Sequence, residues 1–590
     1  MTRPSPEPSP ALPDWPHCRH STAAASGQAR CQGIQVPGDT RCLAHLNDSD
    51  RGAYLGTLSP GADIDHRGTP FTDALLSELL TALTDSATGR PYLAEANFEQ
   101  AKFTRDAVFD GVRFHGGARF QGAVFEATAR FDGAEFGGEA QFEEAHFGGH
   151  TSFERAGFRR GAWFVRAEVA ETAVFGGAIF SGEASFLGAK FRGGAWFGGA
   201  QFRGDTWFRG AEFRGDAGFL KASFDRVSNV GPLMCTGTLD MSEAVFGVAV
   251  TIEVAAAAVH CRRTRWASTA ALRLRHATVD LSDAVLEHPV SVAARSRPFT
   301  ADGEELAEPN WDASRVRVAS LRGVDAAHLV LTDIDLTDCR FAGTIHLDQL
   351  RLEGLYTLAV TPRGLRRRGV RPVRWTPRRT LAEEHHWRAA RSADSAGWSP
   401  PREGEEVLEP AALAPVYRQL RKSFEDGKHE PGAADFYYGE MEMRRHADDI
   451  PWAERSLLTV YWALSGYGLR ASRALTWLLA SMAATVLVMM LWGLPQYDPK
   501  PTSLGTFTSP HRIAISTVTP DPVNPTGPYH ERLSTGRFEK SLRLVINSVV
   551  FRSSGQQLTT VGTYCEMAAR LTEPVLLGLA LLAVRNRVKR

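Results

Sequence analysis

Residues 118–147 read ARFQGAVFEATARFDGAEFGGEAQFEEAHF, and a phenylalanine recurs in them at every fifth or sixth position. The same spacing runs from Phe98 to Phe224, where steps of five and six residues alternate and only Val169 interrupts the phenylalanines. Two residues before nearly every phenylalanine stands an alanine. Helices need apolar steps of three and four, and flat strands need steps of two, so this period fits neither. It predicts a coil with corners, in which each unit forms one short side.

In such a coil the phenylalanine and the alanine point inward, and the residue between them points to solvent. Because successive coils lie ~4.8 Å apart, the spacing of hydrogen-bonded strands, each phenylalanine would stack on one in the next coil. The pattern resembles the phenylalanine-rich branch of the pentapeptide-repeat family, in which a small residue stands two positions before a central Leu or Phe. The resemblance implies a mainly β fold, a right-handed quadrilateral β-helix, with regular repeats over residues 94–255.

Other apolar residues keep the register beyond the phenylalanines, at Val230, Cys235, Met241, Phe246 and Ile252. A second stretch, residues 319–352, has the same period in leucines. We therefore expect an irregular continuation of the β-helix over residues 256–358. Within it, residues 297–311 contain proline and several acids, which predicts a loop extruded from one corner.

The charge of the chain is balanced. Its 590 residues include 67 Lys and Arg and 67 Asp and Glu, and within the phenylalanine repeat Arg alternates with the acids. This balance gives no electrostatic argument for nucleic-acid binding, so we do not expect nucleic acid as a partner. The seven cysteines are odd in number and scattered, which argues against a disulfide framework and favours a reducing cytoplasm for the repeat region.

The first segment, residues 1–60, contains a group of possible metal ligands, Cys18, Cys31, Cys42 and His45. Cys42 and His45 have the spacing of a zinc half-site. A structural zinc ion would stabilise a short Gly- and Pro-rich segment that has little core of its own. The other interpretation is unligated thiols in a loosely ordered leader. A catalytic zinc is not expected, because nothing beside the group supplies a base next to an open coordination position.

Residues 61–93 are predicted to cover the first coil of the β-helix. Leucines at helical spacing over residues 70–86 predict an α-helix, with Thr72 or Asp73 as its N-cap. A solenoid needs such a cover, because its end strands and its lumen are otherwise exposed to aggregation.

Residues 359–410 are predicted to be a basic, Pro- and Arg-rich linker. Its run 363–379 would either be solvated or lie against anionic lipid. The sequence Glu383-Glu384-His385-His386 lacks metalloprotease spacing and is expected to be a solvated helix start. Residues 411–450 predict a helical hairpin, and ADFYYGEMEMRR (434–445) in it resembles the linker of membrane-associated pentapeptide-repeat proteins.

The last region, residues 451–590, predicts two transmembrane helices. Residues 474–494 are uncharged and long enough to cross a ~30 Å hydrocarbon core, and residues 567–584 predict a second span. An aromatic stretch over 456–469 is expected to lie at the membrane interface. By the positive-inside rule, Arg470, Arg473 and the basic residues 585–590 place the repeat domain and the C-terminus in the cytoplasm, and the loop 495–535 outside. The predicted location is therefore the cell membrane, with more than one pass.

Between the spans, Thr559, Thr560, Val561 and Gly562 resemble the start of a potassium-channel filter. A filter needs a second glycine after the aromatic residue, so that successive carbonyls line the pore. Here Tyr564 is followed by Cys565, which departs from that pattern. The alternative is a re-entrant or interfacial helix that only packs against the two spans.

The sequence therefore favours a non-catalytic binding or scaffolding protein that is anchored in a membrane, with lipid and an unidentified protein as partners. An ion-channel-like protein is the alternative from another class. A membrane-associated oxidoreductase rests on a family label alone, because no G-x-G-x-x-G, CxxC or flavin fingerprint is present. Hydrolase motifs are absent as well, so an enzyme is not expected. The sequence leaves the oligomeric state open.

Overall fold

The computed structural model describes residues 14–24, 27–309, 311, 315–368, 371–391, 397–509, 512–550 and 557–588. The chain divides into two compact units, Met1–Leu408 and Glu409–Arg590, which are described separately here. The first unit contains the repeats, and the second contains the apolar helices.

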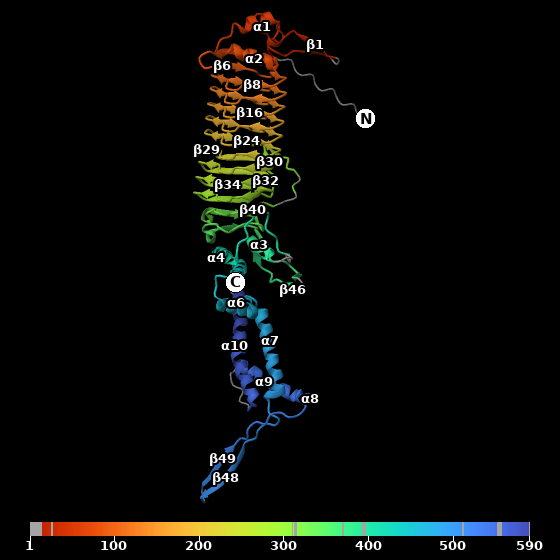
Figure 1. The fold of residues 1–590 in the computed structure, drawn as a ribbon, viewed down its shortest axis with the longest axis vertical. Helices are drawn as coiled ribbons and strands as arrows, with labels where there is room; N and C mark the ends of the chain where they lie inside the picture. The colour runs from red at the N-terminus through yellow and green to blue at the C-terminus, as the bar shows by residue number, and fades with distance from the viewer. Residues whose placement is uncertain are drawn as a thin grey trace. The chain divides into compact units, whose positions relative to one another are not determined.

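The repeats form a β-solenoid of about 12 turns, which confirms the predicted quadrilateral β-helix (Figure 1). One coil has four short strands, such as β10 (Ala118–Arg119), β11 (Val124–Phe125), β12 (Ala129–Arg130) and β13 (Glu135–Phe136). Each pairs in parallel with strands one coil before and one coil after, as Ala118 does with Ala96 and Ala140. Two five-residue and two six-residue units therefore complete one coil of 22 residues.

The phenylalanines fill the lumen as stacked ladders, one along each side. In one ladder Phe131, Phe153 and Phe175 are fully buried or nearly so, and their ring centroids lie 4.7 and 5.1 Å apart with planes 4° from parallel. Rings of neighbouring sides meet edge to face, as Phe142 and Phe153 do at 5.3 Å and 83°. Both geometries are favoured by the ring quadrupole, so each ring has attractive contacts along and across the lumen.

The coil shortens after Phe224. Strands β30 (Asn229–Asp240) and β32 (Val250–His260) pair with two register shifts, between Val230 and Leu233 and between Cys235 and Thr238. From β31 (Val245–Phe246) onward the strands repeat every 20 residues, as in β33 (Arg265–Trp266) and β36 (Val285–Leu286). Four five-residue units now complete a coil. The aromatic ladder continues across the change, because Trp266 stacks on Phe246 at 4.5 Å.

The predicted extruded loop lies between β37 (Val290–Ala294) and β40 (Arg317–Ser320). Thr278 pairs with Arg317 in the next coil, so about one extra coil length of chain leaves the solenoid here. The loop contains a hairpin of β38 (Thr300–Ala301) and β39 (Glu304–Glu305). The solenoid then resumes through β41 (Leu329–Thr332), β42 (Asp335–Leu336), β43 (Arg351–Glu353) and β44 (Thr357–Val360).

The solenoid begins before residue 94. Strands β3 (Ala62–Asp65) and β4 (Pro70–Phe71) pair in parallel with β6 (Arg90–Asn97) and β7 (Lys102–Phe103), and Phe71 stacks on Phe103 at 5.3 Å. Helix α2 (Asp73–Ala82) follows, and Thr72 is its N-cap, since its side chain accepts a hydrogen bond from the Leu75 amide. The helix buries four leucines against the first full coil, as a cover requires.

The second unit is helical. Helices α4 (Pro410–Asp426) and α5 (Glu430–His446) form the predicted hairpin. They are followed by α6 (Trp452–Ser465), α7 (Ala471–Val488) with the π-turn η4 (Met489–Gly493), α8 (Tyr529–Arg532), α9 (Thr535–Val550) and α10 (Thr560–Val588). The predicted external loop contains a β-hairpin, β48 (Thr502–Ser509) and β49 (Arg512–Val518), which the sequence analysis did not anticipate.

The inward ladder generates a prediction at Phe197, which is fully buried and stacks on Phe175 and Phe219 at 4.8 and 4.7 Å. Phe197→Ala should open a cavity and lower the local stability of the surrounding coils by about 3–5 kcal/mol. Hydrogen exchange of the amides in these coils measures that loss. The neighbouring Trp196 points outward and is 43% exposed, so Trp196→Ala is the matched control, with a loss of about 1 kcal/mol or less. Equal losses in the two variants would contradict the inward assignment.

Candidate functional site

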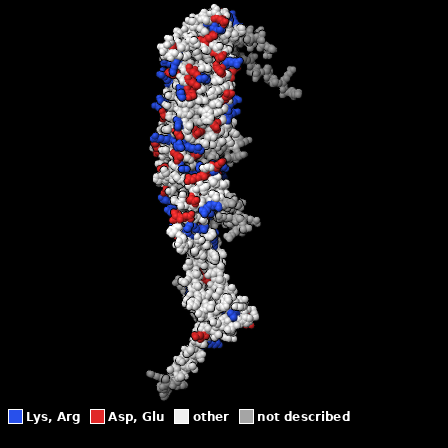
Figure 2. Space-filling model, in the orientation of Figure 1, with Lys and Arg blue, Asp and Glu red and all other residues white. Residues whose placement is uncertain are grey.

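The outer faces of the solenoid carry both signs of charge (Figure 2). Opposite charges meet one coil apart: Arg166 contacts Glu144 and Lys190 contacts Glu168, each at 3.2 Å, and Arg273 contacts Glu253 at 3.0 Å. Such exposed pairs each contribute about 0–1 kcal/mol at most, because solvent screens them. Their main effect is that neighbouring charges cancel, so these pairs do not build a one-signed field for steering a highly charged ligand.

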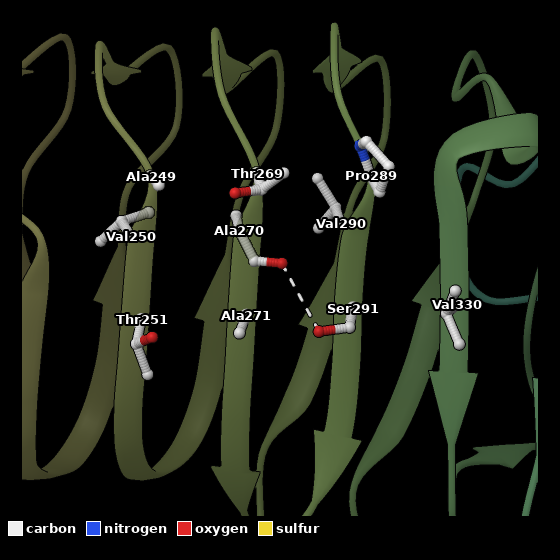
Figure 3. A pocket seen from close by; sticks show the side chains of 10 residues that line it. All are labelled: Ala249, Val250, Thr251, Thr269, Ala270, Ala271, Pro289, Val290, Ser291 and Val330. Atoms are coloured by element: carbon white, nitrogen blue, oxygen red, sulfur yellow. Dashed lines mark hydrogen bonds between the residues drawn. The ribbon is translucent and has the colours of Figure 1, made fainter.

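One face of the 20-residue coils carries a row of small, uncharged side chains beside the Arg273–Glu253 pair. Strands β32, β34 (Ala270–Arg275), β37 and β41 lie side by side, and the aligned residues Thr251, Ala271, Ser291 and Val330 form a row across them (Figure 3). Together with neighbouring small side chains they line a shallow recess of about 360 Å³. Small, uncharged residues on regular strands make a flat surface that suits another protein better than a small molecule, which needs an enclosing pocket.

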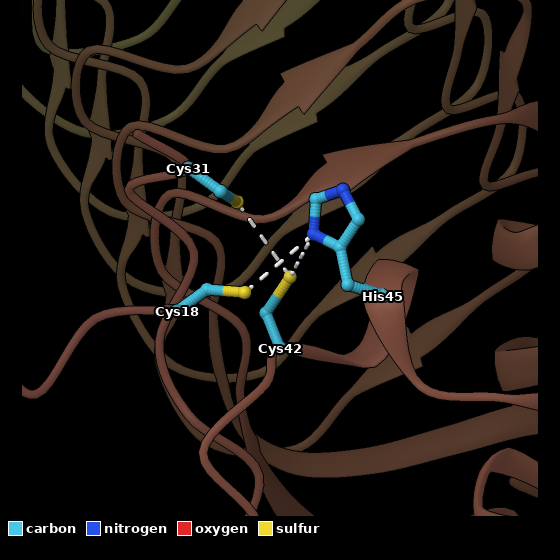
Figure 4. Close-up of side chains that lie close together, drawn as sticks. All are labelled: Cys18, Cys31, Cys42 and His45. Atoms are coloured by element: carbon cyan, nitrogen blue, oxygen red, sulfur yellow. Dashed lines mark hydrogen bonds between the residues drawn. The ribbon is translucent and has the colours of Figure 1, made fainter. Parts of the chain in front are cut away.

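The four predicted metal ligands come together. The ligand atoms of Cys18, Cys31, Cys42 and His45 all lie within 4.8 Å of one another, and their side chains converge on one point (Figure 4). Cys31 Sγ lies 3.7 Å from Cys42 Sγ, and His45 Nδ1 lies 3.2 Å from Cys42 Sγ and 3.6 Å from Cys18 Sγ. A tetrahedral zinc ion, about 2.3 Å from each sulfur, needs sulfurs about 3.8 Å apart. The cluster could therefore hold a metal ion.

The surroundings of the Cys31 thiol favour its ionised form, whereas those of the Cys42 thiol disfavour it. The backbone amide of His20 donates to Cys18 Sγ and that of Gly33 donates to Cys31 Sγ, both at 3.4 Å. A hydrogen bond from Cys42 lowers the pKa of Cys31 to about 5, while the same contact and burial raise the pKa of Cys42. Backbone donors that orient and stabilise thiolates are expected around the ligands of a metal site.

This N-terminal segment packs against the first turn of the solenoid. The Ile34 amide donates to the Arg67 carbonyl at 2.8 Å, so it occupies a backbone group that an end coil leaves unpaired. Below it, His66 is buried with its ring 5.8 Å from Phe71 and 6.4 Å from Phe98. Burial lowers the pKa of His66 to about 4, so at neutral pH an uncharged ring covers the end of the phenylalanine ladder.

At the other end, α3 (Ala382–Ala390) closes the solenoid. Glu383 Oε1 accepts hydrogen bonds from the Phe341 and Ala342 amides, at 2.6 and 2.9 Å. In earlier coils such an amide donates to a carbonyl of the next coil, as Leu321 does to Arg340. The Glu383 carboxylate therefore accepts the hydrogen bonds that a carbonyl of a following coil would accept. Burial raises the pKa of the Glu383 side chain.

The expectation that residues 383–386 are a solvated helix start is wrong. Glu383, Glu384 and His385 are buried, and Glu384 is clamped by Arg378 Nη2 at 2.6 and 2.7 Å and by Arg388 Nε at 2.6 Å. The Arg388 guanidinium lies 5.0–5.2 Å from the ring centroids of three tryptophans, Trp375, Trp387 and Trp398. The occurrence of these three tryptophans within 24 mostly polar residues is the sequence signal that could have predicted this buried cluster.

In the second unit, two helices are long and apolar enough to cross a membrane, Ala471–Gly493 and Thr560–Arg585. They pack closely where Gly493 meets Gly562, since a Cβ on Gly562 would lie 2.4 Å from the Gly493 carbonyl oxygen. Small residues allow such close approach of helices in lipid. The acid within the second helix, Glu573, is buried and accepts a hydrogen bond from Thr485 Oγ1 at 3.1 Å.

The pore-like residues lie at the start of this second helix. Thr559 immediately precedes α10 and donates through Oγ1 to the Trp492 carbonyl, and Thr560, Val561 and Gly562 form the first turn. Carbonyls in a helical turn accept hydrogen bonds within the helix, whereas a filter aims successive carbonyls at a pore axis. The structure thus packs these residues against η4.

The fold and its closed ends define a β-solenoid built on stacked aromatic residues. Residues 93–135, 131–178 and 164–212 match the family described as pentapeptide repeats (9 copies). Residues 93–212 of this chain therefore contain pentapeptide repeats in a phenylalanine-rich form, and two helices able to cross a membrane follow later in the chain. No curated protein and no solved structure matches the chain.

Proposed function

We propose that this protein is a membrane-anchored, non-catalytic binding module that presents its solenoid at the cytoplasmic face. The observation that carries the proposal is the filled lumen. Stacked rings occupy the inside of the phenylalanine coils, and their side chains are almost completely buried. A partner of these coils can therefore bind only to their outer faces or to the ends of the solenoid. A rigid solenoid with regular outer faces suits recognition of another macromolecule.

The distribution of basic residues supports the proposed orientation. Arg470 and Arg473 adjoin the start of the first apolar helix, and Arg585 lies at the end of the second. Basic residues next to a span favour the cytoplasm, so both of these ends, and the solenoid with them, are assigned to that side. The segment 495–535 is then external.

The partner is proposed to be a protein that docks on the uncharged recess across β32, β34, β37 and β41. Ala271 lies at its centre, between Thr251 and Ser291 in the aligned row. A desolvated arginine at this position would disrupt a flat apolar contact, because its charge would be buried without a partner.

The test is isolation of the full chain from native membranes with its bound proteins. Ala271→Arg should remove a specific partner, whereas Val285→Arg, at a 50% exposed position on another ladder of the solenoid, should retain it. Both variants should keep the thermal stability of the parent. If Ala271→Arg retained the same partner, this face would not be the docking surface. If no protein were retained by the parent chain, the binding role would be contradicted.

We also propose that the Cys18, Cys31, Cys42 and His45 cluster holds a structural zinc ion. Three thiolates and one imidazole form a closed tetrahedral set, which leaves no position for a substrate. The ion would fix the segment that pairs with Arg67, so it would stabilise the end of the solenoid rather than supply chemistry.

Metal analysis of the purified full chain should find about one equivalent of zinc. Cys42→Ser should abolish it and increase hydrogen exchange in β3. Cys235→Ser is the matched control, since Cys235 is also buried but lies in the solenoid, away from the cluster. Metal-free protein with a protected β3 would support the unligated thiols instead.

A further inference from the structure

Helix α6 has an exposed side that carries no charge. Trp452, Leu457 and Val460 are 57–76% exposed, and they lie within one arc of the helix together with Ser456 and small alanines. The opposite side is packed, where Leu458 joins a buried cluster with Tyr438, Met441 and Tyr467. Glu454 and Arg455 lie outside the apolar arc. An exposed side of this kind is typical of a helix that lies in the plane of a membrane interface.

The hydroxyl groups near this side are already satisfied within the helix. Ser456 Oγ donates to the Trp452 carbonyl at 2.8 Å, and Thr459 Oγ1 donates to the Arg455 carbonyl at 2.7 Å. Such bonds to the carbonyl four residues back remove the need for water. The surface can therefore contact acyl chains without leaving a hydroxyl donor unpaired.

A tight elbow joins α6 to the first apolar helix. Gly466, Tyr467 and Gly468 all have left-handed backbone conformations, with φ of 55°, 59° and 71°. Tyr467 fixes the turn, because its hydroxyl donates to Glu442 and accepts from Arg445, both at 3.0 Å. The exposed side of α6 is thereby held next to the start of the span.

The elbow contains a recess of about 400 Å³ with a cationic wall. It is lined by Trp462, Ala463, Ser472, Arg473, Thr476 and Trp477, and none of these is acidic. The Arg473 guanidinium lies over the Trp462 ring at 5.1 Å and donates to the Trp462 carbonyl at 3.2 Å. Trp477 Nε1 donates to the Ala463 carbonyl at 3.2 Å, which holds the two helices together. The recess thus combines a fixed cation, a hydroxyl and aromatic walls.

Its place at the start of the first apolar helix is the place where lipid headgroups would lie if this helix spans a bilayer. Ser472 and Arg473 belong to the first turn of α7, and Thr476 lies only about 8 Å from the helix start at Ala471, at 1.5 Å per residue. Interfacial helices bury their apolar side ~5–10 Å into the boundary between headgroups and acyl chains. Aromatic and basic residues at this depth are the usual anchors for lipid.

We propose that the elbow between α6 and α7 binds the phosphate of an anionic membrane phospholipid, with Arg473 and Ser472 as its ligands and the apolar side of α6 against the adjoining acyl chains. This inference rests on the proposed membrane anchoring. It adds a specific lipid site that the anchoring itself does not need, because two spans hold a protein in a bilayer whether or not such a site exists.

Native mass spectrometry of the detergent-solubilised full chain, with phosphatidylglycerol or phosphatidylcholine added, tests the headgroup site. Arg473→Gln should lower phosphatidylglycerol retention about fivefold, the effect of removing one cation near an anionic surface. Arg473→Lys should restore most of it. Arg455→Gln removes the same charge outside the recess, so its retention should match that of the parent chain.

Equal retention by Arg473→Gln and the parent, or preference for phosphatidylcholine, would overturn the proposal. Retention that inorganic phosphate competes away would overturn the assignment to lipid in favour of a free anion. Loss of the parent chain from membranes in alkaline carbonate would instead contradict the membrane anchoring on which the site rests. Failure of the anchoring can therefore be told apart from failure of the lipid site.

A photocrosslinking amino acid tests the orientation of α6 without changing the recess. Placed at Leu457 in the full chain in native membranes, it should crosslink to phospholipid. Placed at Asp448, an exposed position before the helix, it should give little lipid product. A product of two copies of this chain at Leu457, or of this chain with another protein, would show that a protein covers this side and would overturn the proposal.

Discussion

One spacing governs the first unit, the separation of successive coils. Hydrogen bonds between parallel strands set it near 4.8 Å. Stacked phenylalanine rings prefer centroid distances in the same range, and the rings here lie 4.6–5.3 Å apart. Backbone pairing and ring stacking therefore favour the same coil separation. Because a change at one ring alters both neighbouring coils, stability along the solenoid is local and depends on each contact between adjacent coils.

The same logic explains why both ends need dedicated structures. An end coil has backbone groups with no next coil to receive them, and a lumen whose last ring has no neighbour. At the first turn, the Ile34 amide pairs with Arg67 and the buried His66 ring covers the ladder. At the last turn, Glu383 accepts two backbone hydrogens, and Arg378 and Arg388 neutralise the adjacent Glu384. The buried charges of Glu383, Glu384 and Arg378 thus lie where the repeat stops.

The regular coils of the solenoid could be predicted from the sequence, because the five- or six-residue period directly identifies the side chains that point inward. The inward orientation of Ala96, Phe98 and the equivalent residues of later coils could be predicted without knowing any distant contact. The grouping of Cys18, Cys31, Cys42 and His45 was also predicted, since Cys42 and His45 share one short turn. The end structures were missed in part, because Glu383 acts on residues 341 and 342, about forty positions earlier, and no local pattern reports such a contact. Trp266 was missed because the coil had shortened from 22 to 20 residues.

The proposed function joins a solenoid whose lumen is closed to ligands with helices able to cross a membrane, and its central claim is that the solenoid is held at the cytoplasmic face. Labelling of intact cells with a membrane-impermeant maleimide tests this most directly. Leu504→Cys lies in the hairpin between the apolar helices and is exposed, as is Val108→Cys on the solenoid. Relative to the parent chain, the account predicts labelling of Leu504→Cys alone, with Val108→Cys labelled only after the cells are opened. Labelling of Val108→Cys in intact cells would contradict it.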